Sequence, residues 1–140
     1  MDRTWVIVAS RDEVRVFERS GIQPLKLLND IGNPEGRLRP SDLASDKAGA
    51  PADNRFRGRP AYSTEQSKKE RSLINFYDEI CDQLDLALSQ HRFERLILIA
   101  EPRLLGILRD LLPTSLRRCV VQEIQKDLSF ATQTQIEERL

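Results

Sequence analysis

The chain has 140 residues, 22 acidic and 22 basic residues, and 39% hydrophobic residues. This length is typical of one domain with its own core, so we expect residues 1–140 to form a single domain. The balanced charge excludes a protein drawn to nucleic acid or membrane by its overall field, so an electrostatic partner must recognise a local patch.

The opening residues carry no pattern of a targeting signal. Residues 1–4 lead directly into an apolar segment, without the basic and then apolar order of a secretory signal. No apolar run approaches the roughly 20 residues that span a bilayer. We therefore expect a cytoplasmic protein that is not inserted in a membrane.

Cys81 and Cys119 lie in apolar patterns and are expected to be buried free thiols, with a single disulfide between them left open.

The first 31 residues contain three strand-like segments in close succession. Residues 4–10 are apolar at successive positions, which is typical of a strand covered on both faces. Residues 13–19 form a second segment rich in Val, and residues 24–31 place Leu25 and Leu27 on one face. The short polar breaks between the segments predict hairpins, and hence an antiparallel meander.

Regular periodicity is absent between about residue 32 and residue 64. This stretch is rich in Gly, Pro, Asp, Asn, Ser and Arg. A segment of this length without secondary structure is normally functional or disordered when it occurs inside a compact domain. We therefore expect a long flexible loop at 32–64.

A long amphipathic helix is expected over residues 65–90, with Thr64 as its N-cap. Residues 94–100 then predict a second strand that is buried on both faces. The apolar stripe of the helix predicts core packing and contains Leu73, Phe76, Tyr77, Ile80, Cys81, Leu84 and Ala87.

The last third of the chain predicts two helices around an edge strand. Pro102 suits the first position of a helix that Pro113 stops. Residues 118–125 predict the edge strand. Thr132 and Gln135 have the spacing of a capping box for a short helix that ends near the C-terminus.

This order of elements predicts an α/β fold. A helical crossover places the fourth strand parallel to a buried earlier strand, and the first strand has that character. We expect a five-stranded mixed sheet with the spatial order 3-2-1-4-5, flanked by helices. Ribonuclease H-like proteins share this topology.

Seven short motifs occur along the chain in a characteristic order. They are WVIVA at 5–9, RVF at 15–17, NPEGR at 33–37, DLASDKAG at 42–49, RLILIA at 95–100, PRLLG at 102–106 and KDL at 126–128. In their order and spacing the chain resembles the host attachment family ("protein required for attachment to host cells"). These proteins are bacterial relatives of the middle domain of archaeal and eukaryotic peptide-chain release factors. The resemblance covers nearly the whole chain and implies a release-factor-like fold.

The same resemblance bears on catalysis. In release factors, the loop before the long helix carries Gly-Gly-Gln, which positions water at the ester of peptidyl-tRNA. The matching stretch here, residues 54–63, keeps Gly58 but lacks a second glycine and the glutamine. Pro60 also fixes its own φ and removes an N–H donor. The resemblance therefore implies the fold and an exposed basic loop without peptidyl-tRNA hydrolysis, and we expect no catalytic residues.

Three functions remain open, and the first is binding of RNA or the ribosome. Arginines pair with phosphates and aromatic rings stack on bases, and both residue types alternate in the loop before the long helix. Lysines at the start of that helix extend the patch. The predicted RNA- or partner-binding residues are Arg55, Phe56, Arg57, Arg59, Tyr62, Lys68 and Lys69.

A second group of charged loop residues is a candidate for facing a ligand. Its members are Glu35, Arg37, Asp46 and Asp127. For Asp127 a structural use is also expected, in which its carboxylate accepts hydrogen bonds from the loop backbone.

The second function is that of a metal-dependent nuclease, as in ribonuclease H-like proteins. This chemistry needs carboxylates on the first strand, the following helix and the end of the fourth strand. The sequence supplies Ser10 and Asp12, then Glu65 or Glu70, then Glu101. The core of the first strand has no acidic residue, so this function is the least favoured.

The third function is that of a protein-interaction module, including a homodimer formed through an edge strand at 24–31 or 118–125. We expect neither a bound metal nor a cofactor. One histidine and two separated cysteines make no zinc pattern, and no glycine-rich nucleotide motif is present.

Overall fold

A computed structural model describes residues 3–33 and 61–140, with side chains from residue 67 onward in the second range. Its strands form one five-stranded sheet in the order β3-β2-β1-β4-β5. The strands are β1 (Arg3–Ala9), β2 (Glu13–Ser20), β3 (Lys26–Gly32), β4 (Arg95–Ala100) and β5 (Val120–Gln125). β1, β2 and β3 pair antiparallel, whereas β4 is parallel to β1 and to β5. The predicted spatial order and strand directions are confirmed.

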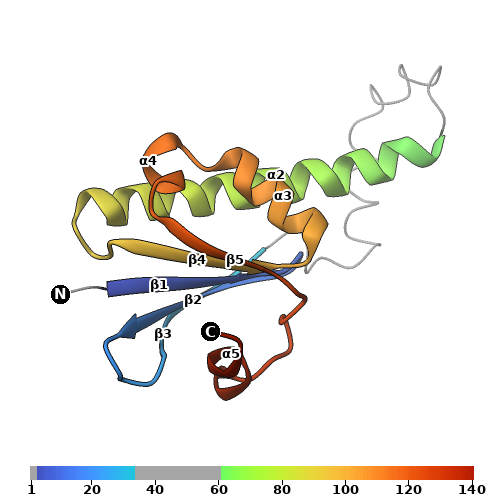
Figure 1. The fold of residues 1–140 in the computed structure, drawn as a ribbon. Coiled ribbons are helices and arrows are strands. Elements are labelled where there is room, and N and C mark those ends of the chain that lie inside the picture. The colour runs from blue at the N-terminus through green and yellow to red at the C-terminus, as the bar shows by residue number, and fades with distance from the viewer. Residues whose placement is uncertain (1–2, 34–60) are drawn as a thin grey trace.

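Helices cover both faces of this sheet, which gives three layers (Figure 1). α2, α3 and α4 lie on one face, and α5 lies on the other. The helices are α2 (Ala61–Ser89), α3 (Pro102–Leu111), α4 (Thr114–Arg117) and α5 (Gln133–Arg139). None of the helices in the described part of the chain combines the length and apolar character needed to cross a membrane.

The two faces of the sheet bury separate apolar clusters because side chains alternate along each strand. Trp5 and Ile7 of β1 belong to the larger cluster beneath α2 and α3. Val6 and Val8 belong to the smaller cluster, which includes Ile136 of α5. All seven residues of the stripe predicted for the long helix are buried. Each fully buried apolar side chain contributes about 1.5–3 kcal/mol.

Leu25 and Leu27 differ in burial, although the ladder is consistent with their expected common face. Leu27 pairs with Phe17, which belongs to the smaller cluster that Leu25 also joins. Leu25 is 3% exposed, whereas Leu27, on the edge strand β3, is 48% exposed. The register shift in this ladder comes after Leu27, where Leu28 is the extra residue between the pairs Phe17–Leu27 and Val16–Asn29.

Two features of the helices differ from the sequence prediction. α2 begins at Ala61, so Thr64 lies inside the helix and is not its N-cap. The short helix α4 was not predicted; it begins after Pro113, which is its N-cap residue. The capping box at Thr132 and Gln135 is confirmed: Thr132 Oγ1 accepts from the Gln135 N–H at 3.2 Å, and Gln135 Oε1 accepts from the Thr132 N–H at 2.8 Å.

The two cysteines are free thiols with different surroundings. Cys81 is buried as predicted, but Cys119 is only half-buried, at the start of the edge strand. Burial raises the pKa of both thiols, and for Cys81 the nearby carboxylates of Asp78 and Asp82 add to this effect. Both side chains are therefore protonated at neutral pH.

The C-terminus of α2 has the hydrogen bonds of a Schellman motif. The His91 N–H donates to Leu88 O at 2.9 Å, and the Arg92 N–H donates to Ala87 O at 3.0 Å. His91 has a φ of 58°, a left-handed conformation that glycine adopts most readily.

We expect His91→Gly to raise the free energy of unfolding by up to about 1 kcal/mol, because relief of the left-handed strain exceeds the added entropy of the unfolded chain. Urea denaturation monitored by circular dichroism measures this change. His91→Ala is the matched control, since it removes the imidazole without relieving the backbone, and it should give no gain. A gain in both variants would assign the effect to the imidazole.

Candidate functional site

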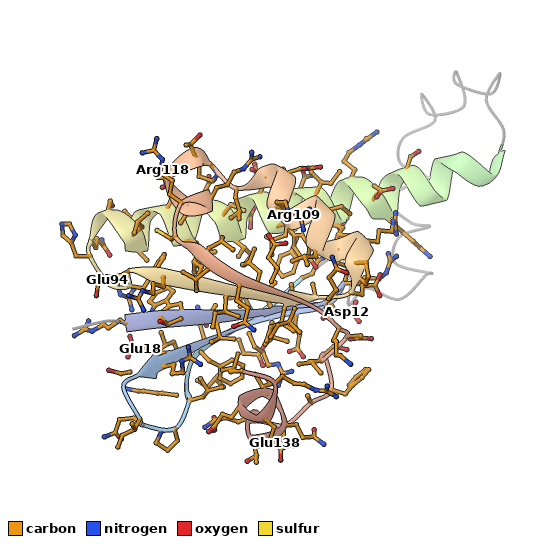
Figure 2. The ribbon with its side chains drawn as sticks, viewed as in Figure 1. Asp12, Glu18, Glu94, Arg109, Arg118 and Glu138 are labelled. Atoms are coloured by element: carbon orange, nitrogen blue, oxygen red, sulfur yellow. The ribbon has the colours of Figure 1, made fainter. Side chains whose placement is uncertain are left out.

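The carboxyl ends of four strands meet along one side of the sheet. β1, β3, β4 and β5 run in the same direction, so the residues that follow them lie together. We call this side the carboxyl edge; Figure 2 shows Asp12 there, far from Arg118 and Glu94. Open α/β sheets bind their ligands outside the carboxyl ends of their strands. A ligand-binding site is therefore expected at the carboxyl edge.

Hydrogen bonds within the β1–β2 turn, and between this turn and Asn33 after β3, hold the centre of the carboxyl edge. The β1–β2 turn is closed by a bond from the Ser10 N–H to Glu13 O at 2.9 Å. Asn33, which follows β3 and begins the NPEGR motif, is 4% exposed. Its backbone N–H donates to Asp12 O at 2.7 Å, and its side-chain amide donates to Arg11 O at 3.4 Å. Asn33, the first residue of this motif, is therefore a structural anchor.

Tyr77 connects the long helix to this edge. Its hydroxyl donates to the carbonyl of Ser10 at 2.8 Å, from a ring that is fully buried. Burial raises the pKa of Tyr77 above its ordinary value; the positive charge of Arg11 opposes this shift and Glu101 adds to it. The hydroxyl therefore remains a neutral donor and fixes the position of α2 relative to β1.

The long helix extends past the sheet on the side of the carboxyl edge (Figure 1). α2 has 29 residues and is about 43 Å long, whereas strands of six to eight residues span about 20–26 Å. Leu73 is the first buried residue in the described part of the helix. We call residues 61–72 the α2 extension; it corresponds to about 18 Å of helix.

Three of the six described side chains of the α2 extension are basic, and one is acidic. Lys69 and Arg71 are exposed, and Lys68 is half-buried. The first turn of the helix has no acidic residue. Because α2 begins at Ala61, Lys68 and Lys69 lie beyond its first turn, where the helix dipole has little effect on charged side chains.

Glu70 is the acidic residue in the described part of this segment, and it pairs with a basic partner. Its carboxylate accepts from Arg103 of α3 at 2.7 Å, with both side chains about half exposed. A pair at this exposure contributes less than about 1 kcal/mol. Among the described residues, no three or more Asp, Glu, His or Cys side chains are grouped to hold a metal ion. The side chain of Glu65, the other carboxylate considered for a nuclease, lies outside the described residues.

Arg15 of β2 joins the opposite face of the sheet to the segment after β5. Its guanidinium donates to the carbonyls of Leu128 at 2.7 Å, Ser129 at 3.1 Å and Ala131 at 2.8 Å. It also lies 5.7 Å from the ring centroid of Phe17. These bonds bring the RVF and KDL motifs together in space. Sequence reasoning missed this role, although an arginine on the apolar face of a strand was a signal for it.

Asp127 shapes the same segment. Its Oδ1 accepts from the Ser129 hydroxyl at 2.6 Å and from the Ser129 N–H at 3.1 Å. These two bonds lower the pKa of Asp127, the hydroxyl being the larger cause. The expected bond from Asp127 to the loop backbone is confirmed.

The remaining predicted site residues divide into two groups. Lys68 and Lys69 lie on the α2 extension, and Tyr62 belongs to the first turn of the helix instead of the loop. The side chain of Tyr62 lies outside the described residues. The other predicted residues also lie outside them: Arg55, Phe56, Arg57 and Arg59 of the predicted binding group, and Glu35, Arg37 and Asp46 of the predicted ligand-facing group.

The mixed sheet, the three layers and the helix order define an α/β domain with the strand order 3-2-1-4-5. The chain belongs to the family described as "Protein required for attachment to host cells", whose model matches residues 5–140. It is 34% identical over 64 residues to "Uncharacterized protein RP470" of Rickettsia prowazekii (strain Madrid E). That match covers 46% of this chain and 39% of the relative, so it spans well under two thirds of the relative's length.

Two solved structures resemble the fold at low sequence identity. The archaeal translation termination factor aRF1 is 10% identical, with a TM-score of 0.51 over 86% of this chain and 29% of the factor. A second structure, titled "Archaeal protein", is also 10% identical, with a TM-score of 0.44 over 98% of this chain and 35% of that one. The first likeness shows a shared fold.

We expect Arg15→Met to lower the free energy of unfolding by about 2–3 kcal/mol, because three carbonyls lose a charged donor while the aliphatic volume is kept. Hydrogen exchange should show reduced protection in residues 128–140 before the rest of the sheet opens. Arg19→Met, at a position outside these bonds on the same strand, is the control. Unchanged protection of 128–140 in Arg15→Met would show that these bonds do not hold the segment.

Proposed function

We propose that this member of the host attachment family is a non-catalytic binding module that engages RNA or the ribosome. The proposed contact surface is the α2 extension, which includes Tyr62, together with Arg55, Phe56, Arg57 and Arg59, which precede it in the sequence. The observation that carries the proposal is the exposure of Lys69 and Arg71 on a helix segment that extends beyond the core. A cytoplasmic location is part of the proposal.

The charge distribution supports an anionic partner. The protein has no net charge, so attraction must come from a local surface. Arg103 neutralises Glu70, which leaves the described part of the α2 extension positively charged. Arginine and lysine contacts to phosphate release bound cations, and this release drives association.

The fold supports the ribosome as the first RNA to test. The archaeal structure that shares the fold is titled a translation termination factor. Residues 54–63 lack the Gly-Gly-Gln of release factors. We therefore propose binding without hydrolysis of peptidyl-tRNA.

We expect the protein to bind ribosomes and a mixed RNA pool at low salt, and more weakly at moderate salt. Lys69→Ala/Arg71→Ala should reduce the slope of log affinity against log salt by about 0.7 for each single-strand phosphate that the variant no longer binds. Fluorescence anisotropy over a salt titration measures this slope. Arg55→Ala/Arg57→Ala/Arg59→Ala tests the preceding residues in the same assay and should also weaken binding.

The matched control is Lys26→Ala/Arg118→Ala, which removes the same charge away from the carboxyl edge. Lys26 begins β3 at the opposite end of the sheet, and Figure 2 shows Arg118 there as well. The control should bind as the unchanged protein does. No binding of the unchanged protein at low salt, or equally weakened binding in both double variants, would contradict the proposal.

A second candidate function is protein interaction through an edge strand. β3 and β5 are the edges of the sheet, and Val121 of β5 is 57% exposed. An exposed edge with an apolar residue is able to pair with another strand. Sedimentation of the purified protein would show a dimer that Val121→Lys dissociates; a monomer at all concentrations would exclude the homodimer.

A further inference from the structure

A fully exposed aromatic ring stands on the turn that follows β5. Phe130 is 98% exposed, the highest value among the aromatic side chains that the structure describes. The turn is closed by a hydrogen bond from the Ala131 N–H to Leu128 O at 3.0 Å. We call residues 128–131 the Phe130 turn.

The Phe130 turn is fixed on three of its four residues. Arg15 donates to the carbonyls of Leu128, Ser129 and Ala131, and Asp127 accepts from Ser129. Leu128 and Ala131 also pack against the smaller apolar cluster. The backbone on both sides of Phe130 is therefore held, and the ring is presented to solvent from a defined position.

A lone exposed apolar side chain is ordinary on a protein surface. Phe130 differs because the partly buried Arg15 guanidinium and the Asx-type turn at Asp127 hold the backbone on both sides of it. None of these hydrogen bonds requires a phenyl ring at position 130. A ring on a held turn binds with a smaller decrease of conformational entropy than a ring on a mobile loop. The arrangement is thus suited to a contact that uses the face of the ring.

The surroundings of Phe130 favour a nucleic acid base over a protein pocket. Protein interfaces bury an apolar centre made of several residues. The other large exposed apolar residues of the described chain lie elsewhere: Ile22 and Leu27 near the β2–β3 turn, Ile74 and Leu86 on α2, and Val121 at the start of β5. A base, in contrast, stacks on a single ring.

The position of the turn joins it to the proposed RNA surface. The Phe130 turn follows β5 at the carboxyl edge, after the exposed residues Lys126 and Asp127. The α2 extension begins at the same edge, on the other face of the sheet (Figure 1). A single strand that contacts the basic residues of the extension can therefore continue across this edge.

We propose that Phe130 is a stacking platform for an unpaired base of RNA, held in place by Arg15. This inference rests on the proposed RNA-binding function and extends it from phosphate contacts to single strands. Stacking requires a base with a free face, so the protein should prefer single-stranded RNA over a duplex of the same sequence.

The test measures binding of a short single-stranded RNA of mixed sequence, and of its duplex, by fluorescence anisotropy at low salt. We expect Phe130→Ala to weaken single-strand binding by about 5- to 100-fold and to leave duplex binding unchanged. Phe130→Trp should retain single-strand affinity, and the fluorescence of the new indole should be quenched by the RNA.

Ile22→Ala is the matched control, because Ile22 is fully exposed on the β2–β3 turn at the opposite end of the sheet. It should bind as the unchanged protein does. Both alanine variants should keep the thermal midpoint, since neither removes a buried side chain.

Three outcomes would overturn the inference, and they are distinguishable. If Phe130→Ala binds single strands normally while Lys69→Ala/Arg71→Ala does not, the proposed function stands and the ring belongs to a protein contact. If Phe130→Ala weakens single-strand and duplex binding equally, the ring does not stack on a base. If the unchanged protein binds neither RNA, the proposed function fails and the inference fails with it.

Discussion

Parallel pairing between β1 and β4, with both strands buried on both faces, is the constraint on which the rest of the structure depends. Val6, Ile7, Leu96, Ile97, Leu98 and Ile99 are all 0% exposed. Strands of this kind are stable only when helices cover both sides of the sheet. A parallel connection also needs a crossover, and α2 supplies it. The same pairing directs the carboxyl ends of β1, β4 and β5 to one edge.

The two faces of the sheet are covered in different ways. On one face, α2 and α3 bury a large apolar cluster, and Tyr77 fixes the helix to the β1–β2 turn. On the other face, α5 has only seven residues and buries Ile136. A helix that short is not stable by itself, so its position depends on tertiary contacts. The Arg15 bonds and the capping box provide them.

The two parts of the proposed binding surface follow from this asymmetry. The α2 extension exists because the crossover helix is about twice as long as the strands it covers. The Phe130 turn exists because the chain must pass from β5 to the opposite face, where Arg15 holds its carbonyls. Both parts lie at the carboxyl edge, although about 60 residues of sequence separate Lys69 from Phe130. Strand direction, set by the β1–β4 pairing, brings them to the same edge.

Sequence patterns predicted most of the fold because the patterns depend on local chemistry. Two-sided apolar runs identified β1 and β4, helical spacing identified the buried face of α2, and the Thr132–Gln135 spacing identified the cap of α5. The exposure of Leu27 was not predictable, because the spatial strand order decides that β3 is an edge strand and leaves this side chain partly uncovered. The start of α2 was also misplaced, since residues 61–64, with the sequence AYST, do not continue the apolar stripe.

The sequence by itself determined the five strands, three of the four described helices, their order and the sheet topology, since each depends on periodicity and on the geometry of crossovers. It also determined the basic character of the segment that begins α2. Only the tertiary structure decided that Arg15 and the turn after β5 interact, because hydrogen bonds between residues more than 110 positions apart leave no local pattern. It likewise decided that Phe130 is exposed. An aromatic residue in an apolar-flanked turn has the same sequence signature whether it faces the core or the solvent, and the anchoring of its neighbours settles the direction.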